Sequence, residues 1–158
     1  MALERQPKVA PYACLYASMK RDFEIIDGIY LVQSSHELDL HNDFNFLELN
    51  YSVENRTLSL SWRRSDGEWV APGTPESVTV EFREVREFRF IPRNEKLPFT
   101  EDDCINSFGY LVDEDWAEGV VITEPGQSPD PNWMTAIDFM SGAVIAVQAT
   151  SAHAQIKA

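Results

Sequence analysis

Apolar and polar residues alternate through the middle of the chain. Two neighbouring runs, residues 45–53 and 57–63, place an apolar side chain at every second position. The apolar positions are Leu47, Leu49, Tyr51 and Val53 in the first run and Leu58, Leu60 and Trp62 in the second. A period of two is typical of a strand that buries one face. Because only the polar residues 54–56 separate the runs, the pattern predicts a β-hairpin.

Other short apolar runs extend this β pattern over most of the chain. Strands are expected at residues 28–33, 77–82, 85–91 and 120–123, with two more inside residues 133–150 around a Met-Ser-Gly turn. Val78, Val80 and Phe82 share one face of their run, and a tight bend or β-bulge is expected before residue 85. The stretches 65–76 and 124–132 are rich in Gly and Pro and predict loops.

Two segments have features of short helices. In residues 12–21, Tyr12, Leu15, Tyr16 and Met19 follow the i, i+3, i+4, i+7 spacing. In residues 99–109, Thr100 is a candidate N-cap and Gly109 a candidate C′ residue. The acids at 101–103 would then lie at the positive end of the helix dipole, which is a structural reason for their presence.

These elements predict a mainly β (α+β) fold, an antiparallel β-sandwich or a strongly bent sheet with one or two short helices. The length of 158 residues favours a single domain over residues 1–158, of which residues 1–22 could be a loosely attached N-terminal segment. No apolar run reaches the length of about 20 residues that a membrane helix needs. The start of the sequence lacks the pattern of a signal peptide, so we expect a soluble, cytoplasmic protein.

The formal net charge is −13 and is unevenly distributed. Residues 1–93 hold 11 basic and 15 acidic side chains, whereas residues 94–158 hold 2 basic and 11 acidic ones. Such a charge repels nucleic acid phosphates and anionic membranes, so neither is an expected partner. It attracts basic proteins and speeds their association. A simpler interpretation, that the charge only maintains solubility, stays open.

The densest acidic segment is DEDWAEG, at residues 113–119. It has the spacing of a calcium loop at only a few positions, and it lacks the glycine that the sharp turn of an EF-hand requires. Trp116 could pack inward or serve as an exposed anchor for a partner. The candidate partner-binding residues are Asp113, Glu114, Asp115, Trp116 and Glu118, together with Glu101 and Asp102.

No motif for catalysis or for a cofactor is found in the sequence. There is no Gly-x-Ser-x-Gly elbow and no phosphate-binding glycine loop. The acids and histidine of residues 36–43 would share a strand face, which we interpret as solvated rather than metal-binding. Cys14 and Cys104 are expected to be reduced, structural thiols, and the C-terminal region around His153 is expected to fray. The sequence therefore predicts no enzyme, no metal and no cofactor.

Arginines and aromatic residues alternate between residues 82 and 93, a composition that can bind single-stranded nucleic acid. Because the chain is strongly acidic, we expect these arginines instead to pair with the neighbouring Glu81, Glu84 and Glu87.

Three stretches, FNFLELNYSVENRTLSLSW, SVTVEFREVREFRF and WMTAIDFMSGAVIAV, resemble strands of small acidic β-rich immunity proteins from bacterial polymorphic or contact-dependent toxin systems. The resemblance covers about residues 44–150. It implies a non-catalytic protein that masks a basic partner, such as a toxin domain. The alternative is a small-molecule-binding β-sandwich or an enzyme of unknown reaction, and the oligomeric state stays open.

Overall fold

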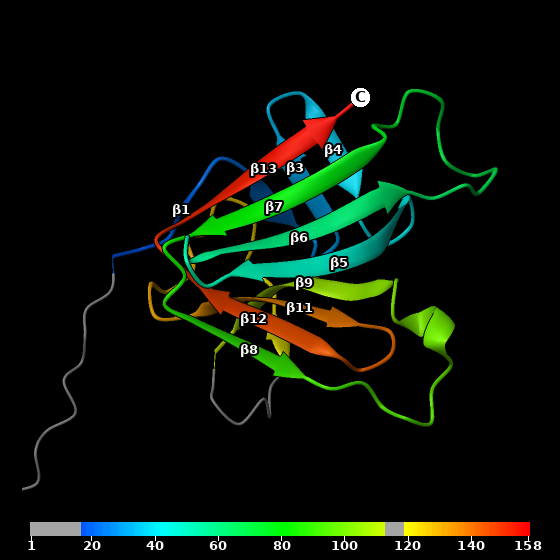
Figure 1. The fold of residues 1–158 in the computed structure, drawn as a ribbon. Helices are drawn as coiled ribbons and strands as arrows, with labels where there is room; N and C mark the ends of the chain where they lie inside the picture. Colours follow the sequence, from blue (N-terminus) through cyan, green and yellow to red (C-terminus); the bar gives the residue numbers. More distant parts are fainter. Residues whose placement is uncertain (1–16, 113–118) are drawn as a thin grey trace, which may run out of the picture.

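The computed structural model describes residues 17–112 and 119–158, which form three β-sheets (Figure 1). The first sheet has the order β1 (Lys20–Arg21), β13 (Ser151–Lys157), β7 (Ser77–Arg83), β6 (Thr57–Arg64) and β5 (Phe44–Ser52). The second has the order β10 (Val120–Val121), β9 (Ile105–Leu111), β11 (Met134–Phe139), β12 (Val144–Gln148) and β8 (Glu87–Ile91). The third is β2 (Glu24–Ile26), β3 (Tyr30–Gln33) and β4 (His36–Asp39).

The first and second sheets face each other and enclose the main core, which confirms the predicted mainly β, sandwich-like fold. The largest fully buried side chains of the first sheet are Phe44, Leu58, Leu60, Trp62, Val78, Val80 and Phe82, and those of the second are Ile105, Phe108 and Ile137. Each such side chain contributes about 1.5–3 kcal/mol of transfer free energy. The third sheet adds Leu31 and Leu38 to the same core.

The predicted hairpin is confirmed as the antiparallel pair β5–β6. The predicted single apolar face of β5 is wrong, because the register shifts between Phe46 and Glu48. The extra residue, Leu47, forms a β-bulge, which breaks the period of two. Consequently Leu47 is exposed, whereas Leu49 and Tyr51 pack against the core; Val53 is exposed because it lies beyond the end of β5, in the turn.

The predicted helix over residues 99–109 is also wrong. Only the 3₁₀ turn η1 (Phe99–Glu101) is helical, its N-cap residue is Pro98 rather than Thr100, and residues from Ile105 onward form β9. Gly109 lies inside β9 and not at a helix end. A side chain there would collide with the backbone oxygen of Val121, so the glycine permits the close approach of β10.

Both ends of the described chain differ from the sequence prediction. Lys20 and Arg21 belong to a strand, not to a helix over 12–21, and residues 1–16 lie outside the described residues. The C-terminal region forms β13, which is inside the first sheet between β1 and β7. The expected fraying was wrong because β13 pairs on both sides, in parallel with β1 and antiparallel with β7.

The predicted bend between residues 83 and 85 is present at Glu84, which has a φ of 53°. It carries the chain from β7 in the first sheet to β8 in the second, which places the two strands in different layers. The stretches 65–76 and 124–132 contain no strand or helix, as expected. Within the described ranges, no helix is long and apolar enough to cross a membrane.

Candidate interaction surface

β5 is an edge strand of the first sheet and β8 is an edge strand of the second, and the two strands lie on the same side of the sandwich. The inner faces of the two sheets are partly exposed on this side. Phe88 and Phe90 of β8 are paired with Val147 and Ile145, whose side chains are buried in the core. Since paired residues share a face, both phenylalanines lie on the inner face of the second sheet. They are nevertheless 36% and 59% exposed, because the first sheet covers them only in part.

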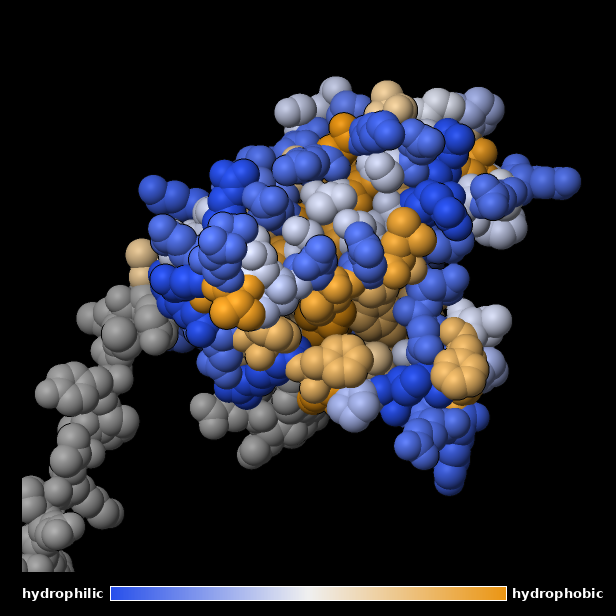
Figure 2. All heavy atoms as spheres, viewed as in Figure 1, coloured by the Kyte–Doolittle hydropathy of each residue, from blue (hydrophilic) through white to orange (hydrophobic). Residues whose placement is uncertain are grey.

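The corresponding strand of the first sheet contributes three further apolar side chains. Tyr51 contacts Phe88 with ring centroids 4.7 Å apart, and Leu49 is partly buried beside the core. Leu47, in the bulge, is 51% exposed. We call these five residues, Leu47, Leu49, Tyr51, Phe88 and Phe90, the open-edge strip. Figure 2 shows apolar side chains gathered and recessed between the two sheets on this side.

One ion pair lies beside the strip on β8, and a second lies on β7. Arg89 donates to Glu87 at 2.6 Å, and Arg83 donates to Glu81 at the same distance. These pairs confirm the expected pairing for two arginines of this segment. Since neighbouring glutamates neutralise Arg83 and Arg89, these two side chains offer less positive charge to nucleic acid phosphates.

Asp102, one of the predicted partner-binding residues, is engaged inside the protein. Its carboxylate accepts a hydrogen bond of 2.8 Å from Arg93 Nε, and this guanidinium holds the pKa of Asp102 below its usual value. Arg93 Nη2 also donates to the carbonyl oxygens of Leu97 and Pro98, at 2.6 and 2.8 Å. The carboxylate of Asp102 therefore has a structural function in the loop before β9.

Glu101 is half-buried in η1, and its carbonyl accepts a hydrogen bond from the Ser141 N–H. The other predicted residues, Asp113, Glu114, Asp115, Trp116 and Glu118, lie outside the described residues.

The acidic stretch 36–43 does not form one extended strand. β4 ends at Asp39, whose carboxylate accepts hydrogen bonds from the N–H groups of His41 and Asn42 in a turn. Burial, with a smaller contribution from Asp39, raises the pKa of Asp43. Among the residues that the structure describes, no group of three or more His, Cys, Asp or Glu side chains is arranged to hold a metal ion.

Sequence reasoning missed two features. The open-edge strip was missed because alternation predicts which side chains share a face but not where the opposite sheet stops. A cavity containing Arg21 and Tyr110 was missed because these residues are 89 positions apart and no local pattern links them.

Comparisons of this chain with protein-family models, with curated proteins and with solved structures find no match. The function is therefore argued from the residues themselves.

Proposed function

We propose that this chain is a non-catalytic binding protein that covers a basic protein partner, and that the open-edge strip is its contact surface. The resemblance to immunity proteins suggests the particular form of this function, neutralisation of a toxin. The observation that carries the proposal is the exposure of Phe88 and Phe90 on the inner face of an uncovered sheet.

Exposed aromatic residues of this kind favour a binding role. Side chains on an inner face would normally be covered by the opposite layer, and contiguous exposed apolar surface marks interaction sites. Aromatic side chains also supply much of the binding free energy at protein interfaces. In addition, within residues 17–112 and 119–158, β5 and β8 each have one edge without a neighbouring strand, so a partner strand could extend either sheet.

The charge indicates the chemistry of the partner. The net charge is −13, and ion pairs involve few of the acidic side chains in the described parts of the chain. The field of the whole molecule therefore attracts a basic protein over distances longer than a direct contact. The strip would then provide the short-range apolar contact.

A capture experiment with matched variants tests this function. The tagged protein is incubated with lysate of the organism that encodes it, at low and at high salt, and the bound proteins are identified by mass spectrometry. The double variant Phe88→Ser/Phe90→Ser removes the exposed aromatic rings of the strip. The control is Trp69→Ser, because Trp69 is 69% exposed but lies in the loop between β6 and β7.

We expect one basic protein, recovered at a one-to-one ratio by the wild type and by Trp69→Ser, and more weakly at high salt. The double variant should lose it. Equal capture by the double variant would overturn the assignment of the strip, and recovery of no basic protein at low salt would contradict the proposed function. Co-expression with the captured protein then tests toxicity and its neutralisation.

A further inference from the structure

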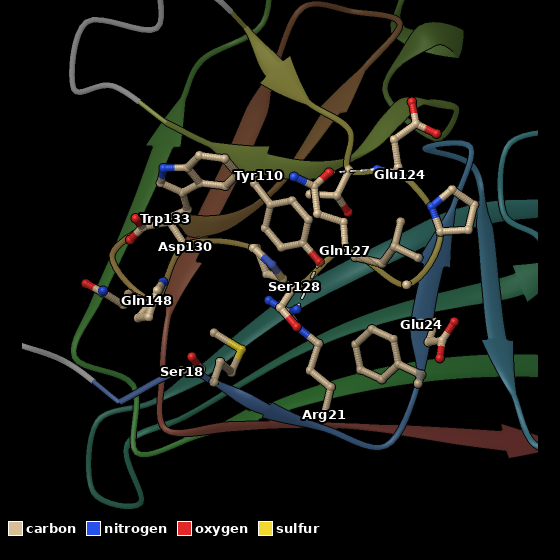
Figure 3. A pocket seen from close by; sticks show the side chains of 18 of the residues that line it. Ser18, Arg21, Glu24, Tyr110, Glu124, Gln127, Ser128, Asp130, Trp133 and Gln148 are labelled. Carbon is tan, nitrogen blue, oxygen red and sulfur yellow. Dashed lines mark hydrogen bonds between the residues drawn. The ribbon is translucent and has the colours of Figure 1, made fainter.

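A second site lies at the other side of the sandwich, where the loop before β11 crosses the start of the described chain. A cavity of about 260 Å³, open to solvent, is lined there by residues of β1, β2, β9, the end of β12 and the 123–133 segment. Figure 3 shows Arg21 reaching toward Tyr110 in the middle of the cavity, with Glu24 and Glu124 on one side and Asp130 and Trp133 on the other.

The guanidinium of Arg21 is held in a fixed orientation. Its Nη1 donates to the Tyr110 hydroxyl and its Nη2 to Thr135 Oγ1, both at 2.9 Å. It also lies 4.9 Å from the centre of the Tyr110 ring, within the range of a cation–π contact. Burial raises the pKa of Tyr110, so its hydroxyl is neutral and does not neutralise the arginine.

Arg21 is mostly buried, yet within the described ranges it has no carboxylate partner at ion-pair distance. Its Nε atom is buried and has no hydrogen-bond partner. Burial of a guanidinium without a counter-ion is unfavourable, which is consistent with the lowered pKa of Arg21. A carboxylate on a bound ligand that accepts from the remaining Nη hydrogens would supply the missing counter-ion, because charge-assisted hydrogen bonds of this kind are strong.

The surroundings of the cavity restrict the ligand further. Glu24, Glu124 and Asp130 are all exposed among its lining residues, so a ligand bearing only negative charge would be repelled. A ligand with a positive group directed toward these acids would be attracted. Trp133 and Tyr110, with ring centroids 6.3 Å apart, provide an aromatic surface for its carbon chain.

We propose that this cavity binds a small zwitterion, whose carboxylate pairs with Arg21 and whose cationic group faces Glu24, Glu124 and Asp130. The volume is near the lower end of typical ligand pockets, about 300 Å³. A ligand the size of a basic amino acid therefore fits. The same chemistry is presented by a free amino acid and by the C-terminal residue of a polypeptide that ends in lysine or arginine.

Calorimetric titration with L-lysine and two analogues tests the recognition. Cadaverine lacks the carboxylate, and hexanoate lacks both ammonium groups. We expect L-lysine to bind with a millimolar or lower Kd and each analogue to bind at least about tenfold more weakly. A tripeptide ending in lysine, as the free acid and as the C-terminal amide, distinguishes the sources: tighter binding of the acid form than of free lysine identifies a polypeptide terminus.

Two outcomes would overturn the proposal: no binding of L-lysine or of the peptide acid at millimolar concentration, or binding of cadaverine as tight as that of L-lysine. The variant Arg21→Met should lose lysine binding, whereas Lys20→Met, the adjacent exposed residue, should retain it. If Arg21→Met does not fold, Glu124→Gln/Asp130→Asn provides a second test, which should weaken binding of lysine and not of hexanoate. Unchanged lysine affinity in either variant contradicts the site. None of these measurements depends on the partner proposed for the open-edge strip.

Discussion

Two arginines, Arg93 and Arg21, have similar aromatic contacts and different electrostatic environments. Arg93 lies 4.5 Å from the centre of the Phe99 ring, and Arg21 lies 4.9 Å from that of Tyr110. Arg93 binds a carboxylate and two backbone carbonyls, whereas Arg21 binds only two neutral hydroxyls. Arg93 therefore has its counter-ion within its own loop, whereas the counter-ion of Arg21 would have to come from a bound ligand.

Because of this difference, Arg93 is expected to stabilise the fold, whereas Arg21 is expected to contribute mainly to the binding of a ligand. Arg93 joins the chain after β8 to η1 through contacts that exist without any ligand, so its contribution belongs to folding. Arg21 is desolvated without compensation by an acid in the described residues, so its contribution to folding is reduced by the cost of burial. Substitution of both by methionine, which keeps the length of the apolar chain, tests the comparison directly.

Without ligand, the largest expected effect is that of Arg93→Met, a decrease of about 1.5–3 kcal/mol in the free energy of unfolding. The hydrogen bonds to the carbonyls of Leu97 and Pro98 are lost, and because both are exposed to water, together they contribute about as much as one typical bond from a charged donor, about 1.5–3 kcal/mol. Urea unfolding followed by fluorescence measures the difference. The control, Arg83→Met, removes a more exposed pair with Glu81 and should cost less than about 1 kcal/mol. An equal loss of stability in Arg93→Met and Arg83→Met would contradict the structural function assigned to Arg93.

The contribution of this loop to the free energy of unfolding should depend on pH through the ionisation of Asp102. Its pKa is lowered in the folded state by Arg93, so its stabilising contribution is complete above the unfolded value of about 3.9. The contribution is lost as the pH falls through the lower folded value. The stability difference between wild type and Asp102→Asn should therefore be constant near neutral pH and shrink below about pH 4.

Asp43 gives a control of the opposite sign. Its pKa is raised in the folded state, so the ionised carboxylate is unfavourable, and Asp43→Asn should be stabilising near neutral pH. That gain should diminish as acid protonates Asp43 in the wild type. Urea unfolding between pH 7 and pH 3 measures both differences, and parallel curves for the two variants would contradict the assignment.

The alternation of apolar and polar residues correctly predicted individual strands and one hairpin of the fold. The β5–β6 hairpin and the buried face of β7 follow from alternation, because a half-buried strand imposes a period of two. The helix over residues 99–109 was predicted from end signals, Thr100 and Gly109, without support from a helical apolar period. The structure pairs Gly109 with Ala136 of β11, so contacts distant in sequence overrode the local signals.

The candidate sites were less predictable than the fold. Charge composition predicts a basic partner, and the acidic clusters predict where it binds, but neither predicts that Asp102 pairs with Arg93. The cavity needs Arg21, Tyr110 and Trp133, which only the packed sheets bring together. Thr135, which helps to orient Arg21, belongs to a predicted strand but has no feature in sequence that links it to an arginine.

The reactivity of the Cys104 thiol should depend on the neighbouring acids Glu101 and Asp103. Burial raises the pKa of its thiol, with smaller contributions from Asp103 and Glu101. In a Cys14→Ser background, the variant Glu101→Gln/Asp103→Asn should react with iodoacetamide a few-fold faster, because more thiolate is present. The variant Glu24→Gln/Glu124→Gln removes acids around Arg21 and should leave the rate unchanged. An equal increase in both variants would show a general charge effect and not a local one.

The smallest expected change in stability is that of Arg21→Met in the absence of ligand, within about 1 kcal/mol of the wild type in either direction. The lost hydrogen bonds to Tyr110 and Thr135 are offset by removal of a desolvated charge, and an apolar replacement of such a charge is often neutral. Addition of L-lysine should make the wild type more stable than Arg21→Met. A ligand at 100 times its Kd raises the unfolding free energy of the protein that binds it by about 2.7 kcal/mol. Thermal unfolding with and without L-lysine should therefore shift the wild type and Lys20→Met upward and leave Arg21→Met unchanged. A large loss of stability in Arg21→Met without ligand would instead make Arg21 a structural residue like Arg93.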